Sequence, residues 1–217
     1  MPDDALPTPA RVLVVAAHPD DIEFGAAGTI ARWVSEGAEI GYLIATRGDK
    51  GSDDPDADLS ELVARREHEQ RDAAAELGVA SVDFLDEPDG LVQPTLALRE
   101  RITRAIRRAQ PEVVMSHDPT VLFVNNEWVN HPDHRAVGQV TVDAVFPTAR
   151  DPLNFPEHRT AGLEPWKVAW VDLPVRPSIQ GRSRNQGRRE VLRGSGSWPA
   201  TRRPGRRPCR RRWAPAG

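Results

Sequence analysis

The sequence predicts an α/β fold with a mostly parallel sheet and helices on both of its faces. Short apolar runs typical of buried strands alternate along the chain with longer segments of helical periodicity. The chain has 217 residues, enough to bury a sizeable core, and its content of 39% hydrophobic and 28% charged residues is ordinary for a globular protein. No linker interrupts the alternation up to residue 175, so we expect residues 1–175 to form one domain.

The first strand–helix–strand unit is complete by residue 45. Residues 11–17 (RVLVVAA) are almost continuously apolar, which indicates a buried strand. Residues 26–36 have apolar side chains at helical spacing before the stop signal Gly37, and residues 39–45 predict the second strand. The later predicted elements are a helix at 59–77, a strand at 82–85, a helix at 96–109, a strand at 112–116, a helix at 134–145 and a strand at 167–172. This order predicts a Rossmann-like sheet.

Residues 176–217 differ in kind from the preceding part of the chain. They contain 13 Arg, no Lys and Glu190 as the only acid, so their formal charge is +12 against −15 for residues 1–175. They show no apolar period, and we therefore expect a disordered, Arg-rich tail. Its composition is typical of an out-of-frame translation of GC-rich DNA, which is the interpretation we favour. The alternative is an arm that binds phosphates by charge. Because the rest of the chain is acidic, we do not expect a nucleic-acid partner.

Three further features of the sequence limit the class of protein. The longest apolar run, residues 12–17, is far too short to cross a bilayer, so we expect no membrane partner. Asp3 and Asp4 stand where a secretory signal would be basic, and we therefore expect a cytoplasmic location. Cys209 is the only cysteine, so any metal must be held by imidazole and carboxylate groups.

Residues that carry chemistry follow two of the predicted strands. Residues 18–23 (HPDDIE) come directly after the first strand, and residues 131–135 (HPDHR) come after the fourth strand and its loop. Ligands gather at the carboxyl ends of strands in such sheets, so both clusters would face one cleft if these strands are neighbours. Two imidazoles and one carboxylate with a fourth position open are a catalytic zinc arrangement. Either cluster alone would also fit a helix cap, and Glu23 fits an outer partner or a helix N-terminal acid equally well.

The sequence resembles the PIG-L/LmbE family in three segments, residues 17–28, 46–51 and 131–138. Members of this family are zinc-dependent N-deacetylases that act largely on molecules containing N-acetylglucosamine. The resemblance covers about residues 10–172 and implies hydrolysis of the acetamide of a small amino-sugar substrate. It also leaves open an amidase of thiol–sugar conjugates and a truncated, inactive member. Family members usually continue with a further strand and helix, for which residues 176–217 show no pattern.

The resemblance implies roles for six residues. It makes His18, Asp21 and His134 the zinc ligands, with Fe²⁺ as the alternative metal because such a donor set accepts both. It makes Asp20 the general base. It assigns stabilisation of the tetrahedral oxyanion to His131, whose ring Asp133 would orient.

Substrate contacts are expected from a second set of residues. The candidates are Arg47, Asp49, Lys50, Arg66, His117 and Trp128. A solvated turn, a helix-surface pair of Arg66 with Glu69, or plain packing of Trp128 would account for several of them equally well. A metallophosphoesterase is the competing enzyme class, which we disfavour because its two metals need more ligands than are clustered here. The sequence selects neither one N-acetylated substrate nor an oligomeric state, and a homo-oligomer stays open.

Overall fold

The computed structural model describes residues 8–124 and 128–173, so the predicted tail at 176–217 lies outside the described residues. The strands are β1 (Arg11–Ala16), β2 (Glu39–Thr46), β3 (Ser81–Glu87), β4 (Val113–Met115), β5 (Phe123–Val124), β6 (Trp128–Val129) and β7 (Trp170–Asp172). The helices are α1 (Asp21–Gly25), α2 (Ala27–Ser35), α3 (Leu59–Glu76), α4 (Leu96–Ala109), α5 (Pro132–Asp143), the π-helical turn η1 (Ala144–Ala149) and α6 (Glu157–Thr160). Among the described residues, no helix is both long and apolar enough to cross a membrane.

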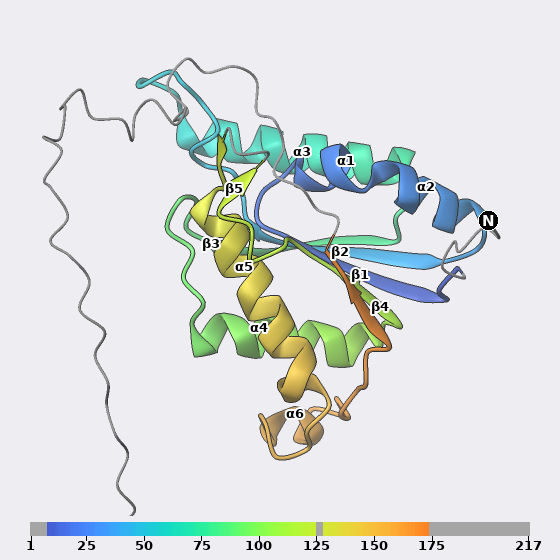
Figure 1. Cartoon of the computed structure of the whole chain (residues 1–217). Helices are drawn as coiled ribbons and strands as arrows, with labels where there is room; N and C mark the ends of the chain where they lie inside the picture. The colour runs from blue at the N-terminus through green and yellow to red at the C-terminus, as the bar shows by residue number, and fades with distance from the viewer. Residues whose placement is uncertain (1–7, 125–127, 174–217) are drawn as a thin grey trace, which may run out of the picture.

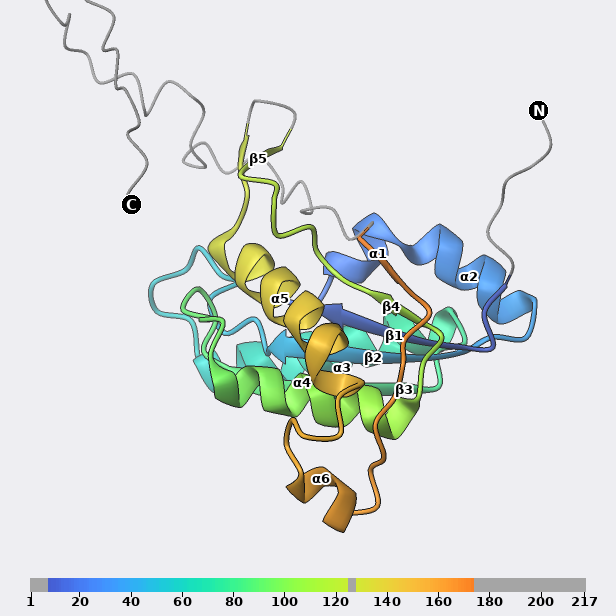
Figure 2. The same ribbon diagram turned by 60° about the horizontal axis from the view of Figure 1, so that its bottom comes forward.

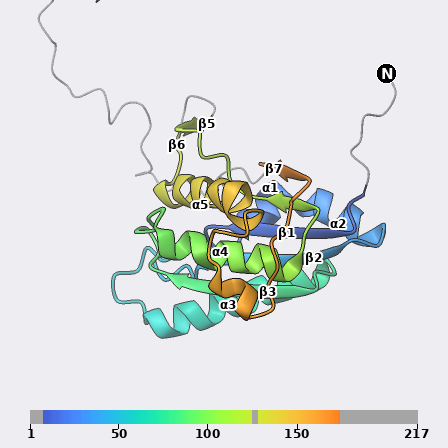
Figure 3. The ribbon, with the colours of Figure 1, turned by 90° about the horizontal axis from the view of Figure 1, so that it is seen from below.

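The strands of the main sheet are parallel and stand in the order β3-β2-β1-β4-β7. Helices α1, α2 and α3 cover one face of this sheet, and α4 and α5 lie on the other face (Figures 1 and 3). The predicted α/β fold is therefore confirmed. Because β1 pairs with both β2 and β4, the two loops that carry the histidine clusters leave neighbouring strands. This adjacency meets the condition under which both clusters share one end of the sheet.

Strand β1 is buried on both faces, and its side chains alternate between two apolar clusters. Val12 and Val14 pack with Trp33 of α2 on one face. Leu13 and Val15 pack on the other face, where α4 and α5 supply much of the cluster. Such two-sided burial explains why the strand is a continuous apolar run rather than an alternating one. Packing on both faces therefore fixes the register of β1, and the turn that follows begins from a rigidly held strand.

The structure differs from the predicted elements in three places. The single helix expected at 26–36 is preceded by the short helix α1, which begins at Asp21 and ends before a break at Ala26. Helix α5 begins at Pro132, two residues earlier than expected, because proline is favoured in the first turn and His131 caps the helix. Strands β5 and β6 form a short antiparallel hairpin, which stands out from the rest of the fold in Figure 2.

Candidate metal centre

The turn between β1 and α1 carries the first cluster. The backbone N–H of His18 donates a 2.8 Å hydrogen bond to Oδ2 of Asp21, which closes the turn over three residues. Asp20 lies at φ 85° in the left-handed region, which Asp tolerates better than most residues. As a result Asp20 and Asp21, although adjacent, belong to different surroundings. Asp21 is fully buried, whereas the Asp20 side chain is about one-third exposed, at 34%.

The start of α5 carries the second cluster. His131 is the N-cap, and its Nδ1 accepts a 3.2 Å hydrogen bond from the backbone N–H of Asp133. Asp133 and His134 follow in the first turn, and both are buried. The Nδ1 atom of His134 lies 3.2 Å from Oδ1 of Asn130, and its Nε2 is directed at Asp21. The carboxamide thus orients the ring in the way that outer partners commonly orient a metal-binding imidazole.

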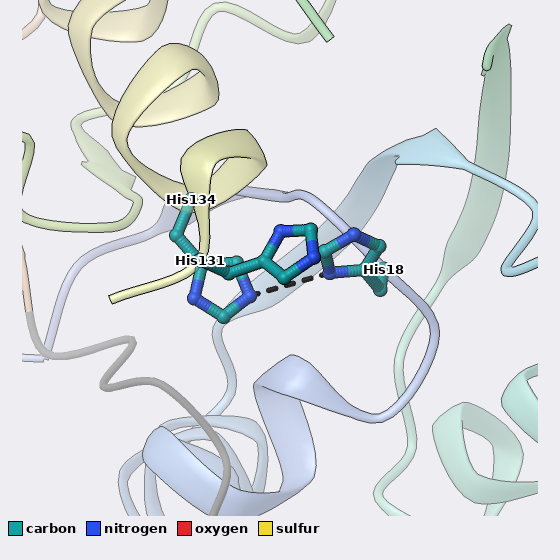
Figure 4. Close-up of side chains that lie close together, drawn as sticks. All are labelled: His18, His131 and His134. Atoms are coloured by element: carbon teal, nitrogen blue, oxygen red, sulfur yellow. Dashed lines mark hydrogen bonds between the residues drawn. The ribbon is translucent and has the colours of Figure 1, made fainter. Parts of the chain in front are cut away.

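Three predicted ligands converge at this point. Nδ1 of His18 lies 3.2 Å from Nε2 of His134 and 3.4 Å from Oδ2 of Asp21. Nε2 of His134 lies 3.1 Å from Oδ1 of Asp21. Figure 4 shows the rings of His18 and His134 facing one another, with His131 beside them. Ligands at zinc distances of ~2.0–2.1 Å in a tetrahedron are about 3.3–3.4 Å apart, and each of these separations is close to that value, with the two rings facing different oxygens of Asp21.

An unsatisfied buried oxygen supports the same interpretation. Oδ1 of Asp21 is buried and accepts no hydrogen bond of normal geometry, although Nε2 of His134 is close to it. Buried carboxylate oxygens are normally hydrogen-bonded or bound to a cation. The cluster of His and carboxylate groups can therefore hold a metal ion, as the donor distances also indicate.

Asp89 also belongs to this group of His and carboxylate side chains, although the sequence motifs did not indicate it. Its Oδ1 lies 3.2 Å from Nε2 of His18, and Oδ2 of Asp133 lies at the same distance from that nitrogen. Asp133 also accepts hydrogen bonds from the backbone N–H groups of Gly90 and Val92, at 2.7 and 3.2 Å. The signal for Asp89 was its position just past the end of β3, because the carboxyl end of that strand reaches the same edge of the sheet.

The electrostatics of the site favour a cation. Burial lowers the pKa of His18, but hydrogen bonds to the three surrounding carboxylates outweigh burial and raise it to about 11, so a bound metal ion would have to displace the proton of this ring. Burial raises the pKa of Asp21, yet the neighbouring imidazoles hold it well below its ordinary value. Burial lowers the pKa of His134, which favours the neutral ring that a metal requires. Three ionised carboxylates around the imidazoles leave excess negative charge, which a divalent ion would neutralise.

The surroundings of the Asp20 carboxylate differ from those of Asp21. Burial and the charge of Asp21 raise its pKa, while Arg66 opposes this shift. Nη2 of Arg66 donates to Oδ2 of Asp20 at 3.2 Å and to the carbonyl oxygen of Pro19 at 2.9 Å. The second carboxylate oxygen, Oδ1, accepts no hydrogen bond from the described residues. One oxygen is therefore anchored, and the other is buried without a hydrogen-bond partner among the described residues.

The structure also places His131 and Asp133, the other two predicted catalytic residues. His131 is half-exposed at the mouth of the cluster, and its ring lies edge-on to that of His18 at a centroid distance of 4.6 Å. Its Nδ1 is 3.9 Å from Oδ2 of Asp133, longer than a hydrogen bond. In this arrangement the carboxylate of Asp133 contacts His18 and two backbone N–H groups, and it is the backbone of Asp133 that bonds the ring of His131.

The predicted substrate residues separate into two groups. Arg66 and His117 reach the cluster: Nε2 of His117 is 3.3 Å from Oδ2 of Asp21 and accepts a 3.0 Å hydrogen bond from the N–H of Ala17. Asp49 and Lys50 reach the cluster through Asp89. Lys50 donates to Asp89 through its backbone and side chain, and Asp49 accepts a 3.4 Å hydrogen bond from the Asp89 N–H.

Two further candidates contact other parts of the fold. Arg47 forms ion pairs with Glu67 and Asp86, so its charge is shared between α3 and β3. Trp128 belongs to the hairpin strand β6 and pairs with Val124. No contact of either residue with the cluster residues is seen in the described part of the chain.

Comparison with known families decides the affiliation of the chain. Residues 13–145 match the family described as "PIG-L: GlcNAc-PI de-N-acetylase". This range contains both histidine clusters and the turn that carries Asp20. The chain belongs to the PIG-L family. The resemblance noted in the sequence is thereby confirmed.

Three relatives illustrate the affiliation. The diacetylchitobiose deacetylase of Thermococcus kodakarensis is 32% identical over 161 residues, which are 74% of this chain and 58% of the relative. The 1D-myo-inositol 2-acetamido-2-deoxy-alpha-D-glucopyranoside deacetylase of Kineococcus radiotolerans is 32% identical over 209 residues, covering 80% of this chain and 54% of the relative. The solved structure of N,N'-diacetylchitobiose deacetylase from Pyrococcus horikoshii, complexed with its inhibitor MPG, has a TM-score of 0.71 and 29% identity, covering 76% of this chain and 60% of that one.

The chain spans between half and two thirds of the length of these relatives. The matched part contains the sheet and the cluster of histidine and carboxylate groups.

Proposed function

We propose that the protein is a metal-dependent N-deacetylase that hydrolyses the acetamide of a small molecule containing N-acetylglucosamine. The observation that supports it most is the convergence of His18, Asp21 and His134 at the end of β1, in the turn that also contains Asp20. The two curated relatives described above are deacetylases of acetylated amino sugars.

His18, Asp21 and His134 would hold the ion, and we favour Zn²⁺ with Fe²⁺ as the alternative. A bound Zn²⁺ supplies Lewis acidity, which acidifies water and polarises an amide carbonyl. A donor set of two imidazoles and one carboxylate leaves room for a fourth partner. The alternative metal is tested by reconstituting the metal-free protein with each ion and comparing the activity per bound metal.

The remaining chemistry falls to groups of the chain itself. Asp20 accepts a proton from the attacking water through Oδ1, the oxygen without a hydrogen-bond partner, and its raised pKa favours this role at neutral pH. The half-exposed ring of His131 donates a hydrogen bond to the oxyanion that forms on the acetamide carbonyl. Asp20, once protonated, returns this proton to the leaving amine, and the products are acetate and a free amino sugar. His131 could serve instead only with its ring protonated, which the Asp133 N–H donating to its Nδ1 opposes.

The test is an assay of the full chain, loaded with Zn²⁺, against a panel of candidate substrates. The panel holds N-acetylglucosamine, N,N'-diacetylchitobiose, an N-acetylglucosaminyl inositol, an amide of glucosaminyl inositol with a larger thiol-bearing acyl group, and an aryl phosphate. We expect acetate and primary amine in equal amounts from at least one acetamide. Cleavage of the larger amide alone would favour the amidase alternative, and phosphate release alone would overturn the proposal in favour of a phosphoesterase.

A further inference from the structure

A buried amide side chain of α3 contacts the turn that carries Asp20, and none of the roles above uses it. Gln70 is 3% exposed. Its Oε1 accepts a 2.8 Å hydrogen bond from the backbone N–H of Asp20, and its Nε2 donates a 2.8 Å hydrogen bond to Oε1 of Glu23. A backbone N–H can only donate and a carboxylate only accepts, so these partners define the orientation of the amide.

The position of Gln70 in α3 suggests more than packing. The buried residues of this helix are Leu62, Gln70 and Ala74, so Gln70 is the polar member of an otherwise apolar face. A leucine would fill a similar volume, but it would leave the N–H of Asp20 without an acceptor. Buried polar side chains that are fully hydrogen-bonded fix one local geometry. The geometry fixed here is that of the turn beside the metal centre.

The backbone that Gln70 holds is in an unusual conformation. Asp20 has φ 85° and ψ −23°, which residues other than glycine, asparagine and aspartate rarely adopt. No side chain caps the start of α1, and two side chains of α3 restrain the Pro19–Asp20 peptide from outside the turn: Gln70 accepts from its N–H, and Arg66 donates to its carbonyl oxygen. Conformations of this kind persist where the surroundings enforce them.

The backbone conformation determines where the Asp20 carboxylate lies. Asp21 faces His134 and His117. One oxygen of Asp20 faces Arg66, and the other has no hydrogen-bond partner among the described residues. Rotation of the Asp20 backbone towards negative φ would move this carboxylate while the buried Asp21 stayed in place. The separation of the two neighbouring carboxylates into ligand and base therefore depends on the left-handed turn.

We propose that Gln70 is a positioning residue that holds the Asp20 carboxylate for base catalysis. Its side chain accepts a hydrogen bond from the backbone N–H of Asp20 and is itself held by the hydrogen bond that it donates to Glu23. The inference rests on the proposed deacetylase function, in which Asp20 is the base. The hydrogen-bond partners of the Gln70 side chain are Asp20 and Glu23, neither of which is among the proposed metal ligands. Gln70 acts through Asp20.

The first test compares Gln70→Leu with Gln139→Leu, the same change at an exposed position of α5. We expect Gln70→Leu to lower kcat by about 10- to 100-fold, a part of the ~10²–10⁴-fold that a general base contributes, with KM and metal content unchanged. Gln139→Leu should match the wild type. In an Asp20→Asn background, Gln70→Leu should cause no further loss. Equal, additive losses in both backgrounds would overturn the proposal, because they would mean that Gln70 does not act through Asp20.

A second test uses rescue. Gln70→Glu alone brings a carboxylate against Glu23 and should lower kcat. The double variant Glu23→Gln/Gln70→Glu keeps the charge of the pair and reverses its donor and acceptor, while position 70 still accepts from the Asp20 N–H. We expect kcat of the double variant to return to within about threefold of the wild type. A double variant that is no more active than Gln70→Glu would count against the inferred hydrogen bonds.

A third measurement does not depend on activity. Hydrogen exchange at the Asp20 amide should be protected in the wild type and lose this protection in Gln70→Leu, with exchange in β1 unchanged. Unaltered exchange at Asp20 overturns the proposal whatever the activity. If protection is lost but the wild type deacetylates no acetamide, the proposed function is wrong while the role of Gln70 in holding Asp20 stands.

Discussion

Gly138 of α5 lies directly against the main-chain carbonyl of His117, just past the end of β4. A Cβ atom at position 138 would be 2.4 Å from the His117 oxygen and 3.1 Å from its carbonyl carbon. One helical turn before Gly138, the ring of His134 stacks on that of His117 with a centroid distance of 4.2 Å and an interplanar angle of 3°. The missing side chain of Gly138 thus permits the approach that brings His134 to the sheet.

We therefore predict that Gly138→Ala destabilises the protein and weakens metal binding. The contacts are with backbone atoms, which cannot rotate away, so α5 must shift, and overpacking of this kind typically costs ~1–3 kcal/mol. Gly28→Ala is the matched control, because nothing lies within 4 Å of its Cβ position and alanine is more favourable than glycine within a helix such as α2. Urea unfolding and zinc titration of both variants measure the effects. Equal behaviour of the two variants would contradict the steric argument.

His134→Ala should abolish tight metal binding. Loss of an outer partner of a ligand typically costs 10–100-fold in metal affinity, so loss of a ligand itself should cost more than about 100-fold. The control is His68→Ala, since the side chain of His68 is 77% exposed on α3 and lies outside the cluster. Elemental analysis after dialysis gives the occupancy of both variants. Full occupancy in His134→Ala would remove this residue from the ligand set.

Asp20→Asn should separate the base from the ligands. The variant keeps Asp21, and we expect it to retain one equivalent of metal while kcat falls by ~10²–10⁴-fold. The amide at position 20 can still accept from Arg66, so the turn should persist. Parallel measurement of metal content and acetate release decides the outcome. A metal-loaded variant with wild-type kcat would show that another group takes the proton.

Much of the fold could be predicted from the sequence because its signals are local. The apolar run that forms β1 and the helical periodicity of α3 and α4 each lie within one segment, and glycines mark several of their ends. The hairpin of β5 and β6 could not be predicted, because strands of two residues are too short to show a period. The same applies to α6, which has four residues.

The candidate site divides in the same way. His18, Asp21 and His134 stand in two short motifs, so they could be identified as candidate ligands from the sequence alone. Asp89 and Gln70 stand in no motif, and their partners are 71 and 50 residues away in the chain. Their roles depend on the pairing of β1 with β2 and on the packing of α3 over the turn, which periodicity does not specify.

Arg107 provides a test of the packing beneath α5. Its side chain is 1% exposed and donates to five main-chain carbonyl oxygens, those of Thr148, Ala149, Asp151, Asn154 and Phe155. Hydrogen bonds to charged groups contribute ~1.5–3 kcal/mol each, so we expect Arg107→Met to lower the free energy of unfolding by at least ~3 kcal/mol. Arg108→Met, at an exposed neighbouring position, should change it by less than ~0.5 kcal/mol. Similar unfolding curves for the two variants would contradict the prediction.

Asp58 should make the stability of the protein depend on acid pH. It is the N-cap of α3, the helix that carries both Arg66 and Gln70, and its Oδ1 accepts from the N–H of Ser60 at 2.9 Å and from that of Glu61 at 3.2 Å. The hydroxyl and backbone of Ser60, with the backbone of Glu61, hold the pKa of Asp58 below its ordinary value.

Because the pKa of Asp58 is lower in the folded than in the unfolded protein, its contribution is fully present above the unfolded value of about 3.9 and is lost as the pH falls through the folded value. We therefore expect Asp58→Ala to be less stable than the wild type by a constant amount between pH 5 and pH 7, within the usual approximation that other groups titrate alike in both proteins. Below about pH 4 this difference should shrink. Asp58→Asn, whose cap does not titrate, should differ from Asp58→Ala by the same amount throughout. Urea unfolding of the three proteins from pH 3 to pH 7 measures these differences, and a gap between wild type and Asp58→Ala that widens in acid would contradict the assigned cap.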